Sequence, residues 1–294
     1  MSMPAIDVPD LVPPADRARL HQAQRFHTPV GQGRIAWHAW GERRAGVAPL
    51  VLFHGGSGSW THWIKNILPL VDAGRWVLAV DLPGFGDSDP PPGGTDADAM
   101  LEPLATGLRT LLPGEAVDLV GFSFGGMTAG LLLAAHPELA QRLVLVGAPA
   151  MGLTPGRQFE LRAWRHLGTP AAQTDAHRHN LGVLMLHDAR LIDGLALQVH
   201  IANVARDRLP RRRLAHTDIL ARTLPRVRCP VHAIYGACDA VYGPYVDRLD
   251  GAFAASAPEF RGLQRIEGAG HWVPFEAPAA FDAALRRALN PAPE

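Results

Sequence analysis

The sequence predicts an α/β fold, a mostly parallel sheet flanked by helices, and three observations carry this prediction. The run Pro49-Leu50-Val51-Leu52-Phe53 is continuously apolar, which is typical of a parallel strand covered on both faces. The run Ala116-Val117-Asp118-Leu119-Val120 is interpreted as a second buried strand, and a helical segment follows it. With 294 residues, 47% of them hydrophobic, the chain is long enough for one large α/β domain with an insertion.

The remaining elements are expected in order between turn residues. A short helix is expected from Pro13 to Gln24, a second from near Asp96, and a third over 127–135 that stops near Pro137. Apolar or alternating segments bounded by turn residues predict strands over 34–40, 49–53, 76–80, 116–120, 142–146 and 263–266, and one that begins at Pro230.

The stretch Gly121-Phe122-Ser123-Phe124-Gly125-Gly126 places a serine at the corner between a strand and a helix. At such a corner the backbone is strained and the serine Oγ is pushed out above the edge of the sheet. Glycines two residues before and two residues after the serine leave room for neighbouring backbones. The context predicts that Ser123 is a nucleophile; the alternative, a helix N-cap, explains Ser123 alone and not the motifs that accompany it.

A serine nucleophile needs a base, and the base needs a group that orients it. His271 lies in the loop Gly268-Ala269-Gly270-His271-Trp272, just after an expected strand. Asp239 lies in a tight turn after the strand that begins at Pro230, where its carboxylate is placed to accept the imidazole N–H. Asp247 and Asp250 are the nearby competitors for that role.

A fourth motif, His54-Gly55-Gly56-Ser57-Gly58, follows the apolar strand that ends at Phe53. Small residues there allow the backbone N–H of Gly56 to point at a substrate carbonyl oxygen, and the N–H of Phe124 is the second expected donor. Such a pair forms an oxyanion hole, in which one donor is worth about 3 kcal/mol of transition-state stabilisation. We expect His54 to orient this loop and to take no part in the chemistry.

With these motifs in this order, the chain resembles the α/β-hydrolase fold superfamily, in its serine-nucleophile branch, from Phe26 to Leu289. The turn Asp81-Leu82-Pro83-Gly84-Phe85-Gly86-Asp87-Ser88 is a further feature of that family. The resemblance implies a mostly parallel eight-stranded sheet with an inserted helical cap. We expect residues 1–146 and 224–294 to form the core and residues 147–223 to form the cap.

The cap is expected to cover the carboxyl ends of the strands and to select the substrate. Helical apolar spacing is seen in 159–164, 181–185 and 191–204. The pocket is expected to be lined from both parts of the chain, by Trp60, Phe122, Trp164, Leu184 and Trp272. The aromatic side chains of Trp60, Phe122, Phe124 and Trp272 favour an apolar acyl or aryl group in the pocket.

The serine nucleophile predicts hydrolysis of a carboxylic ester, lactone or thioester through an acyl-enzyme. Dehalogenases and epoxide hydrolases of similar architecture attack with an aspartate and are therefore disfavoured. The runner-up is a carbon–carbon bond hydrolase of ring-fission products, whose His-Gly-Gly loop and Trp after the histidine look similar. Phe122 stands where those enzymes have an asparagine, which argues against it. A non-catalytic small-molecule binding protein is the third reading.

Composition excludes several other classes. The 28 basic and 28 acidic residues balance, and the run Arg211-Arg212-Arg213 is interpreted as a solvated turn, so no nucleic-acid partner is expected. No apolar run is long enough to span a membrane, and the N-terminus lacks the features of a signal peptide. Two cysteines, Cys229 and Cys238, are expected to be free thiols in the cytoplasm. We expect no cofactor, no metal at His177-Arg178-His179, and a small-molecule substrate; a homodimer is an alternative to a monomer.

Overall fold

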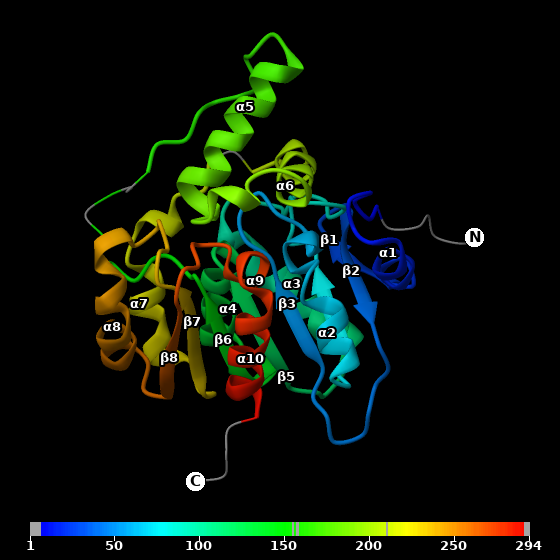
Figure 1. Ribbon diagram of the computed structural model, residues 1–294. Helices are drawn as coiled ribbons and strands as arrows, with labels where there is room; N and C mark the ends of the chain where they lie inside the picture. The colour runs from blue at the N-terminus through cyan, green and yellow to red at the C-terminus, as the bar shows by residue number, and fades with distance from the viewer. Residues whose placement is uncertain (1–6, 155, 157–158, 210, 291–294) are drawn as a thin grey trace.

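The computed structural model describes residues 7–154, 156, 159–209 and 211–290. One eight-stranded sheet runs through the molecule in the order β1-β2-β4-β3-β5-β6-β7-β8 (Figure 1). β2 is antiparallel to β1 and β4, and all other neighbours are parallel, which confirms the predicted fold class. The strands are β1 Gln24–Val30, β2 Gly33–Trp40, β3 Leu50–Phe53, β4 Val77–Val80, β5 Val117–Phe122, β6 Ala140–Val146, β7 Val231–Gly236 and β8 Phe260–Ile266.

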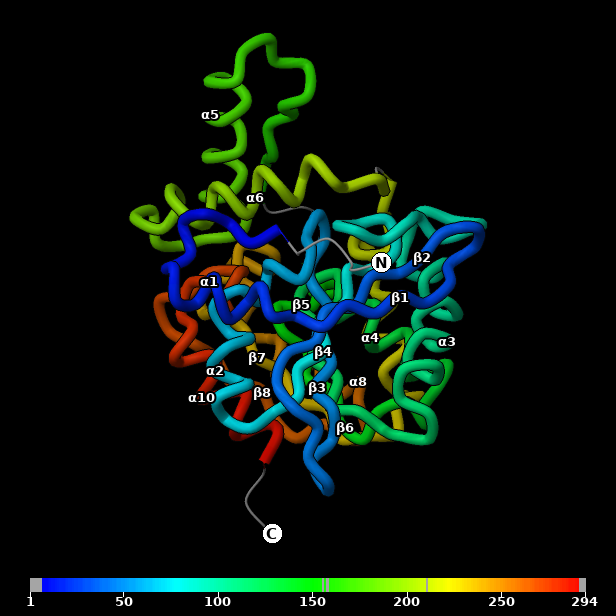
Figure 2. The backbone as a smooth tube through the Cα atoms, turned by 90° about the vertical axis from the view of Figure 1, so that its right-hand side faces the viewer, coloured from blue at the N-terminus to red at the C-terminus, as the bar shows by residue number. Residues whose placement is uncertain are grey.

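Helices cover both faces of the sheet (Figures 1 and 2). α3, α4, α7 and α8 share one hydrophobic core, and α1, α2 and α10 share the other. Alternate residues of β3 feed these two cores, since Val51 and Phe53 point to the first and Leu50 and Leu52 to the second. The helices are α1 Pro14–Leu20, α2 Ile67–Asp72, α3 Leu101–Leu111, α4 Phe124–Ala135, α5 Pro170–Asn180, α6 Leu195–Ala205, α7 Ile219–Thr223, α8 Leu249–Ser256, α9 Val273–Glu276 and α10 Pro278–Leu289.

The start of the chain differs from its prediction. α1 ends at Leu20, and Gln24, expected in the helix, begins β1. β1 pairs with β2 from Gln24 opposite Ala39 to Val30 opposite Gly33. The prediction missed this strand because Pro29 interrupts its pattern. Proline lacks an N–H and is tolerated at a sheet edge, which is where β1 lies.

The segment 147–223 contains α5, α6, α7 and a π-helical turn over Leu181–Met185. α5 projects away from the body and α6 crosses above the strands (Figures 1 and 2). α7 instead packs against α4 and α8 in a layer beside the sheet. The helical prediction for 159–164 is wrong, because the chain there is irregular. Its alternate residues Phe159 and Leu161 face one cavity, and Asn180 hydrogen-bonds to both backbone groups of Arg162.

None of the described helices combines the length and the apolar character that a bilayer span requires.

One close approach of two backbone segments in the core lies where α4 meets the end of β3. A Cβ built on Gly125 would collide with the backbone oxygens of Phe53 and His54, and one built on Gly121 would collide with the backbone of Gly125 and Gly126. Backbone atoms cannot rotate away as side chains can. These glycines therefore allow the helix after β5 to lie directly against the loop after β3.

Gly125→Ala is expected to lower the free energy of unfolding by at least about 2 kcal/mol, because the added methyl group forces backbone segments apart. Gly251→Ala is the matched control, since Gly251 also lies in a helix and a Cβ there meets nothing within 4 Å. That control should be neutral or stabilising by about 0.5–1 kcal/mol. Denaturant unfolding of the two variants measures both changes. Equal stability of the two variants would contradict this account of Gly125.

Candidate active site

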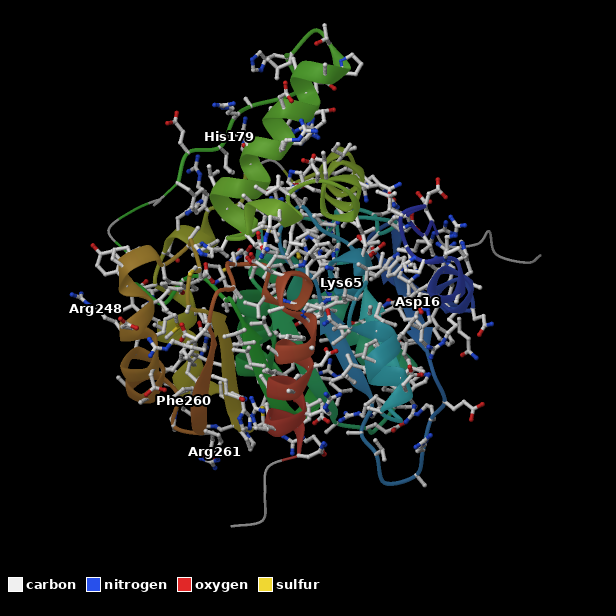
Figure 3. All side chains as sticks on the ribbon, in the orientation of Figure 1. Asp16, Lys65, His179, Arg248, Phe260 and Arg261 are labelled. Carbon is white, nitrogen blue, oxygen red and sulfur yellow. The ribbon has the colours of Figure 1, made fainter. Side chains whose placement is uncertain are left out.

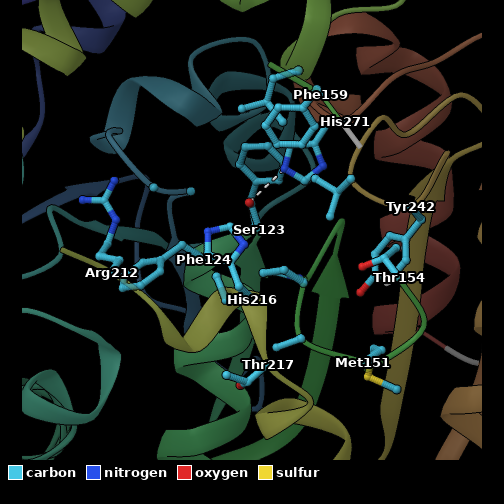
Figure 4. Close-up of a pocket in the computed structure, with 18 of the residues that line it drawn as sticks. Ser123, Phe124, Met151, Thr154, Phe159, Arg212, His216, Thr217, Tyr242 and His271 are labelled. Carbon is cyan, nitrogen blue, oxygen red and sulfur yellow. Dashed lines mark hydrogen bonds between the residues drawn. The ribbon is translucent and has the colours of Figure 1, made fainter. Parts of the chain in front are cut away.

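Loops at the carboxyl ends of four strands of the sheet, β3, β5, β7 and β8, converge on one cavity. Ser123 follows β5, Asp239 follows β7, His271 follows β8, and the loop from His54 follows β3. Parallel strands end at the same edge of a sheet, so residues far apart in the chain meet there. Figure 4 shows Ser123 and His271 joined by a hydrogen bond at this edge.

Three of the predicted site residues form a continuous hydrogen-bonded chain. The Nε2 atom of His271 lies 2.8 Å from Oγ of Ser123, and its Nδ1 atom lies 2.9 Å from each carboxylate oxygen of Asp239. An ionised carboxylate can only accept, so Nδ1 carries the proton and Nε2 is free to accept from the serine hydroxyl. His271 and Asp239 are buried, and Ser123 is partly exposed to the cavity.

The backbone of Ser123 is strained, with φ of 50° and ψ of −120°. A non-glycine residue rarely adopts positive φ, and such outliers persist only where the surroundings hold them. Here the Ser123 N–H donates to the Val146 carbonyl at 2.7 Å, and α4 begins at the next residue. The turn thus presents Oγ to the cavity beside the N-terminus of a helix, where free N–H groups favour negative charge.

His54 sets the direction of the neighbouring peptide plane. Its Nε2 accepts from the Leu82 N–H at 2.9 Å, so its Nδ1 carries the proton and donates to the Gly55 carbonyl at 2.7 Å. In a trans peptide the carbonyl and the following N–H point in opposite directions. The N–H of Gly56 is therefore turned away from His54. Gly56 and Phe124, the two expected oxyanion donors, both line the cavity.

The structure separates Asp239 from its competitors. Asp239 is completely buried, and its Oδ1 also accepts from the Val241 N–H at 2.9 Å. Asp247 is exposed and pairs with Arg265, and Asp250 is exposed on α8. Only Asp239 of the three contacts His271.

The cavity beside Ser123 has a volume of about 700 Å³. One part of its lining is apolar and comes mainly from the 147–223 segment: Met151, Phe159, Leu161, Leu184, Met185 and Val241. Another part is polar: Ser57, Thr154, Arg212, Thr217 and Asp218. Figure 4 shows Arg212 beside Phe124, with Met151, Thr154 and Tyr242 on the other side of Ser123.

Two of the five expected pocket residues, Phe122 and Leu184, line this cavity; Trp60, Trp164 and Trp272 are not in its described lining. Trp60 packs on Trp40 at 5.3 Å between ring centres. Trp272 stacks on Phe275 at 4.3 Å, and its Nε1 donates to the His62 carbonyl.

Trp164 packs against His177 on α5 at 4.6 Å. Trp60 and Trp272 are buried and Trp164 is half-buried, and each of the three rings packs against a neighbouring ring.

The sequence interpretation missed Arg212 and Asp207. Arg212 belongs to a run of three arginines that was assigned to solvent, yet its side chain is only 19% exposed. Its guanidinium lies over the rings of Phe85 and Phe124 and pairs with Asp207, and both residues also contact Ser57. The sequence offers one signal for such an ion pair. The three arginines follow Asp207 and Leu209 closely, and no glutamate or lysine lies near them.

One cluster of potential metal ligands occurs among the described residues. His38, Asp81 and Asp87 offer ligand atoms within 4.8 Å of one another. The Asp81 carboxylate already accepts from the backbone N–H groups of Trp60 and Asp87, and Asp87 pairs with Arg25 and Arg206. These oxygens serve protein donors, which favours a structural role for the cluster.

The histidines of α5 are also accounted for by protein contacts. His177 packs between Trp164 and His200, and Nε2 of His179 lies 3.2 Å from the Glu160 carbonyl. His179 is on the projecting α5 (Figure 3). Neither arrangement points to a ligand set.

Burial lowers the pKa of several histidines around the site. Burial lowers the pKa of His54 to about 4, against the opposing effect of the Asp81 carboxylate. Burial also lowers the pKa of His62 well below its ordinary value; this residue accepts from the Gly55 N–H through Nδ1. Both imidazoles are therefore neutral at pH 7, which is what their acceptor roles require.

Comparisons with known proteins agree with this architecture. Residues 48–182 match a family model described as the alpha/beta hydrolase fold. The chain is similar to the carboxylesterase CesB from Bacillus subtilis, with a TM-score of 0.75 at 18% identity over 95% of this chain and 97% of that one. It is also similar to the esterase RhEst1 from Rhodococcus sp. ECU1013, with a TM-score of 0.71 at 24% identity over 91% and 98%. The matched family model and these solved structures show that the chain has the alpha/beta hydrolase fold.

The curated relatives include proteins named as hydrolases of 2-hydroxy-6-oxo compounds and a protein named as an esterase. One is a 2-hydroxy-6-oxononadienedioate/2-hydroxy-6-oxononatrienedioate hydrolase of Cupriavidus pinatubonensis, 35% identical over 37% of this chain and 38% of the relative. Another is an esterase of Mycobacterium tuberculosis, 40% identical over 46% of this chain and 42% of the relative. The matches thus span about two fifths of the relatives' length.

The low pKa of His54 makes stability depend on pH. Its folded pKa of about 4 lies below the unfolded value of about 6.5. Below pH 6.5 the unfolded chain binds a proton that the folded chain does not, so stability is full above 6.5 and falls as the pH drops toward 4. Over that window His54 accounts for about 3 kcal/mol. Unfolding free energies measured between pH 4 and 7 should show this slope, and His54→Gln should have a shallower one. An identical slope in the variant would contradict the assignment.

Proposed function

We propose that the protein is a serine hydrolase that acts through Ser123, His271 and Asp239 and an acyl-enzyme. Its proposed substrate is a small, largely apolar carboxylic ester, lactone or thioester. The observation that carries the proposal is the hydrogen-bonded chain from Asp239 through His271 to the strained Ser123, which ends in a cavity. This is the geometry that activates a serine hydroxyl.

The proposed reaction has two halves. His271 Nε2 takes the proton of Ser123 while Oγ attacks the substrate carbonyl carbon, and the N–H groups of Gly56 and Phe124 stabilise the oxyanion. His271 then gives the proton to the leaving alcohol or thiol as its bond to the acyl group breaks. In the second half, water loses a proton to His271 and attacks the acyl-enzyme. Collapse of that intermediate returns the proton to Ser123 and releases the acid.

Two observations favour an ester over a carbon–carbon bond. Phe122, directly before Ser123, places an apolar ring in the cavity lining where the runner-up enzymes typically carry an asparagine. Trp272, which suggested those enzymes, packs on Phe275. The curated relatives named as carbon–carbon bond hydrolases keep ring-fission product hydrolysis as the second candidate.

We also propose that the 147–223 segment acts as the cap. It supplies much of the apolar lining of the cavity, and α5 and α6 lie above the strand ends (Figure 2). Two free cysteines, Cys229 and Cys238, fit a reducing compartment, and we propose the cytoplasm as the location.

Ser123→Ala should lower kcat/KM for the best ester by at least about a thousandfold while the melting temperature stays close to that of the wild type. Asp239→Asn and His271→Ala should be comparably impaired, and combining either with Ser123→Ala should add little, because the three groups act as a unit. Asp247→Asn is the matched control and should keep wild-type activity. A Ser123→Ala variant within about tenfold of the wild type would refute the nucleophile assignment.

The substrate class is tested by steady-state hydrolysis of p-nitrophenyl esters of graded chain length beside a ring-fission dienoate. We expect turnover of short to medium apolar acyl esters. Preferred turnover of the dienoate would instead select the second candidate. Turnover of neither, with tight binding of a small molecule, would select a binding protein.

Leu184→Ala should shift the preferred acyl chain length, because Leu184 lines the cavity and its truncation enlarges the space beside Ser123. Trp164→Ala is the control, since Trp164 packs on His177 outside the described lining. It should lower stability more than it changes the ester profile. The two profiles come from the same ester series, and a larger shift in the Trp164 variant would show that the cavity is wrongly assigned.

A further inference from the structure

Residues 206–209 and 211–213 form a strap that crosses from α6 to the loops around Ser123. Arg208 donates to the carbonyl groups of Phe85, Gly86 and Ser88, and the side chain of Leu209 lies against Gly84. The strap is thus attached at several points to the turn that follows β4.

The strap is also hydrogen-bonded to the loop after β3, through the side chain of Ser57. Oγ of Ser57 donates to Oδ2 of Asp207 at 2.5 Å and accepts from Nη2 of Arg212 at 3.0 Å. Arg212 Nη1 in turn donates to both oxygens of Asp207 at 2.9 Å and to the Leu209 carbonyl at 2.7 Å. The three side chains form a closed triangle, with Asp207 and Arg212 14% and 19% exposed.

The backbone of Ser57 is itself unusual, with φ of 51°. Together with Ser123 and Ala150 it is one of the few non-glycine residues of the described chain with positive φ. A serine there is disfavoured unless its surroundings hold it. The two hydrogen bonds to its hydroxyl are the contacts that hold it.

We propose that Ser57, Asp207 and Arg212 form a clamp that positions the Gly56 N–H for the oxyanion. The proposal rests on the proposed function and assigns these residues a positioning role in it. Ser57 directly follows Gly56, and a Cβ on Gly56 would lie 3.7 Å from Nη2 of Arg212. The clamp therefore holds the loop from one side while His54 fixes the Gly55 carbonyl from the other.

The opposite charges of Asp207 and Arg212 stabilise the clamp at neutral pH. Burial raises the pKa of Asp207, but the hydrogen bond and charge of Arg212, with the Ser57 and Leu209 donors, outweigh burial and hold the pKa below its ordinary value. Asp207 is thus ionised at neutral pH and accepts from both partners. The guanidinium is held in place in turn by the ring of Phe124, the residue that carries the other expected donor.

The test compares Ser57→Ala, Ser57→Gly and Asp207→Ala with the control Arg211→Ala, an exposed arginine next to Arg212. Two assays are used. Steady-state hydrolysis of the best ester gives kcat and KM, and a fluorophosphonate probe gives the rate at which Ser123 is labelled. A misplaced oxyanion donor lowers the stabilisation of the transition state and leaves the affinity for the substrate unchanged. Each clamp variant should lose about tenfold or more in kcat and in labelling rate, with KM within about twofold. Arg211→Ala should match the wild type.

Ser57→Gly separates the clamp from backbone strain, because glycine adopts positive φ freely. It should be as slow as Ser57→Ala although its fold is not strained. The double variant Ser57→Ala with Asp207→Ala should be no slower than the worse single variant.

Wild-type kcat and labelling in Ser57→Gly, or losses confined to KM, would overturn the clamp while leaving the proposed function intact. A wild-type protein that neither hydrolyses esters nor reacts with the probe would overturn the proposed function, a different result from the same assays.

Discussion

The turn from β5 into α4 is the constraint on which the rest of the site depends. Ser123 adopts its strained conformation because its N–H is bound to the Val146 carbonyl and α4 starts at once behind it. That start is possible only because Gly121 and Gly125 allow backbone to touch backbone. The helix then lies against the loop after β3, so the serine and the proposed oxyanion donors move as one body. Backbone packing thus places the serine beside the loop whose orientation the His54 side chain then fixes.

His54 is the second residue that fixes the geometry of the site, and it can do so only as a neutral imidazole. It accepts from the Leu82 N–H and donates to the Gly55 carbonyl, a pair of bonds that an imidazolium could not make. Protonation would break the first bond inside a completely buried site. The same burial that lowers its pKa to about 4 thus keeps the Gly55–Gly56 peptide in one orientation at neutral pH.

The fold and the hydrogen-bonded set of Ser123, His271 and Asp239 could be predicted because each part sits in a short motif with a local physical signal. Ser123 and His271 lie among glycines at strand ends, and the chain order constrains Asp239. The predictions that failed concerned the direction in which a side chain points or the residues that it contacts. A sequence pattern encodes neither. Trp60, Trp164 and Trp272 are large and apolar, but only the fold decides which way a ring points.

The same reasoning explains two further errors. The segment 159–164 has helical spacing, yet its chain is irregular, and the side chain of Asn180 binds the backbone N–H and carbonyl of Arg162 in place of helical partners. Arg212 was assigned to solvent because an arginine run usually is solvated. Its burial depends on Asp207 and on the ring of Phe124, which lies far away in the sequence.

The roof of the cavity (residues 181–205) is attached to the sheet by polar contacts as well as by apolar packing, since Leu181, Met185 and Leu197 belong to the same hydrophobic core as Leu50 and Leu52. The Trp272 N–H donates to the Met185 carbonyl at 2.7 Å, and Glu276 accepts from the Asp188 N–H at 2.6 Å, next to His271. On the other side, Asn203 of α6 binds Ser59 in the loop after β3. Specific hydrogen bonds hold a segment in one register without demanding any particular apolar lining between them. Side chains such as Leu184 can therefore change to suit another substrate while the attachments keep the roof, and with it the space above Ser123, in place.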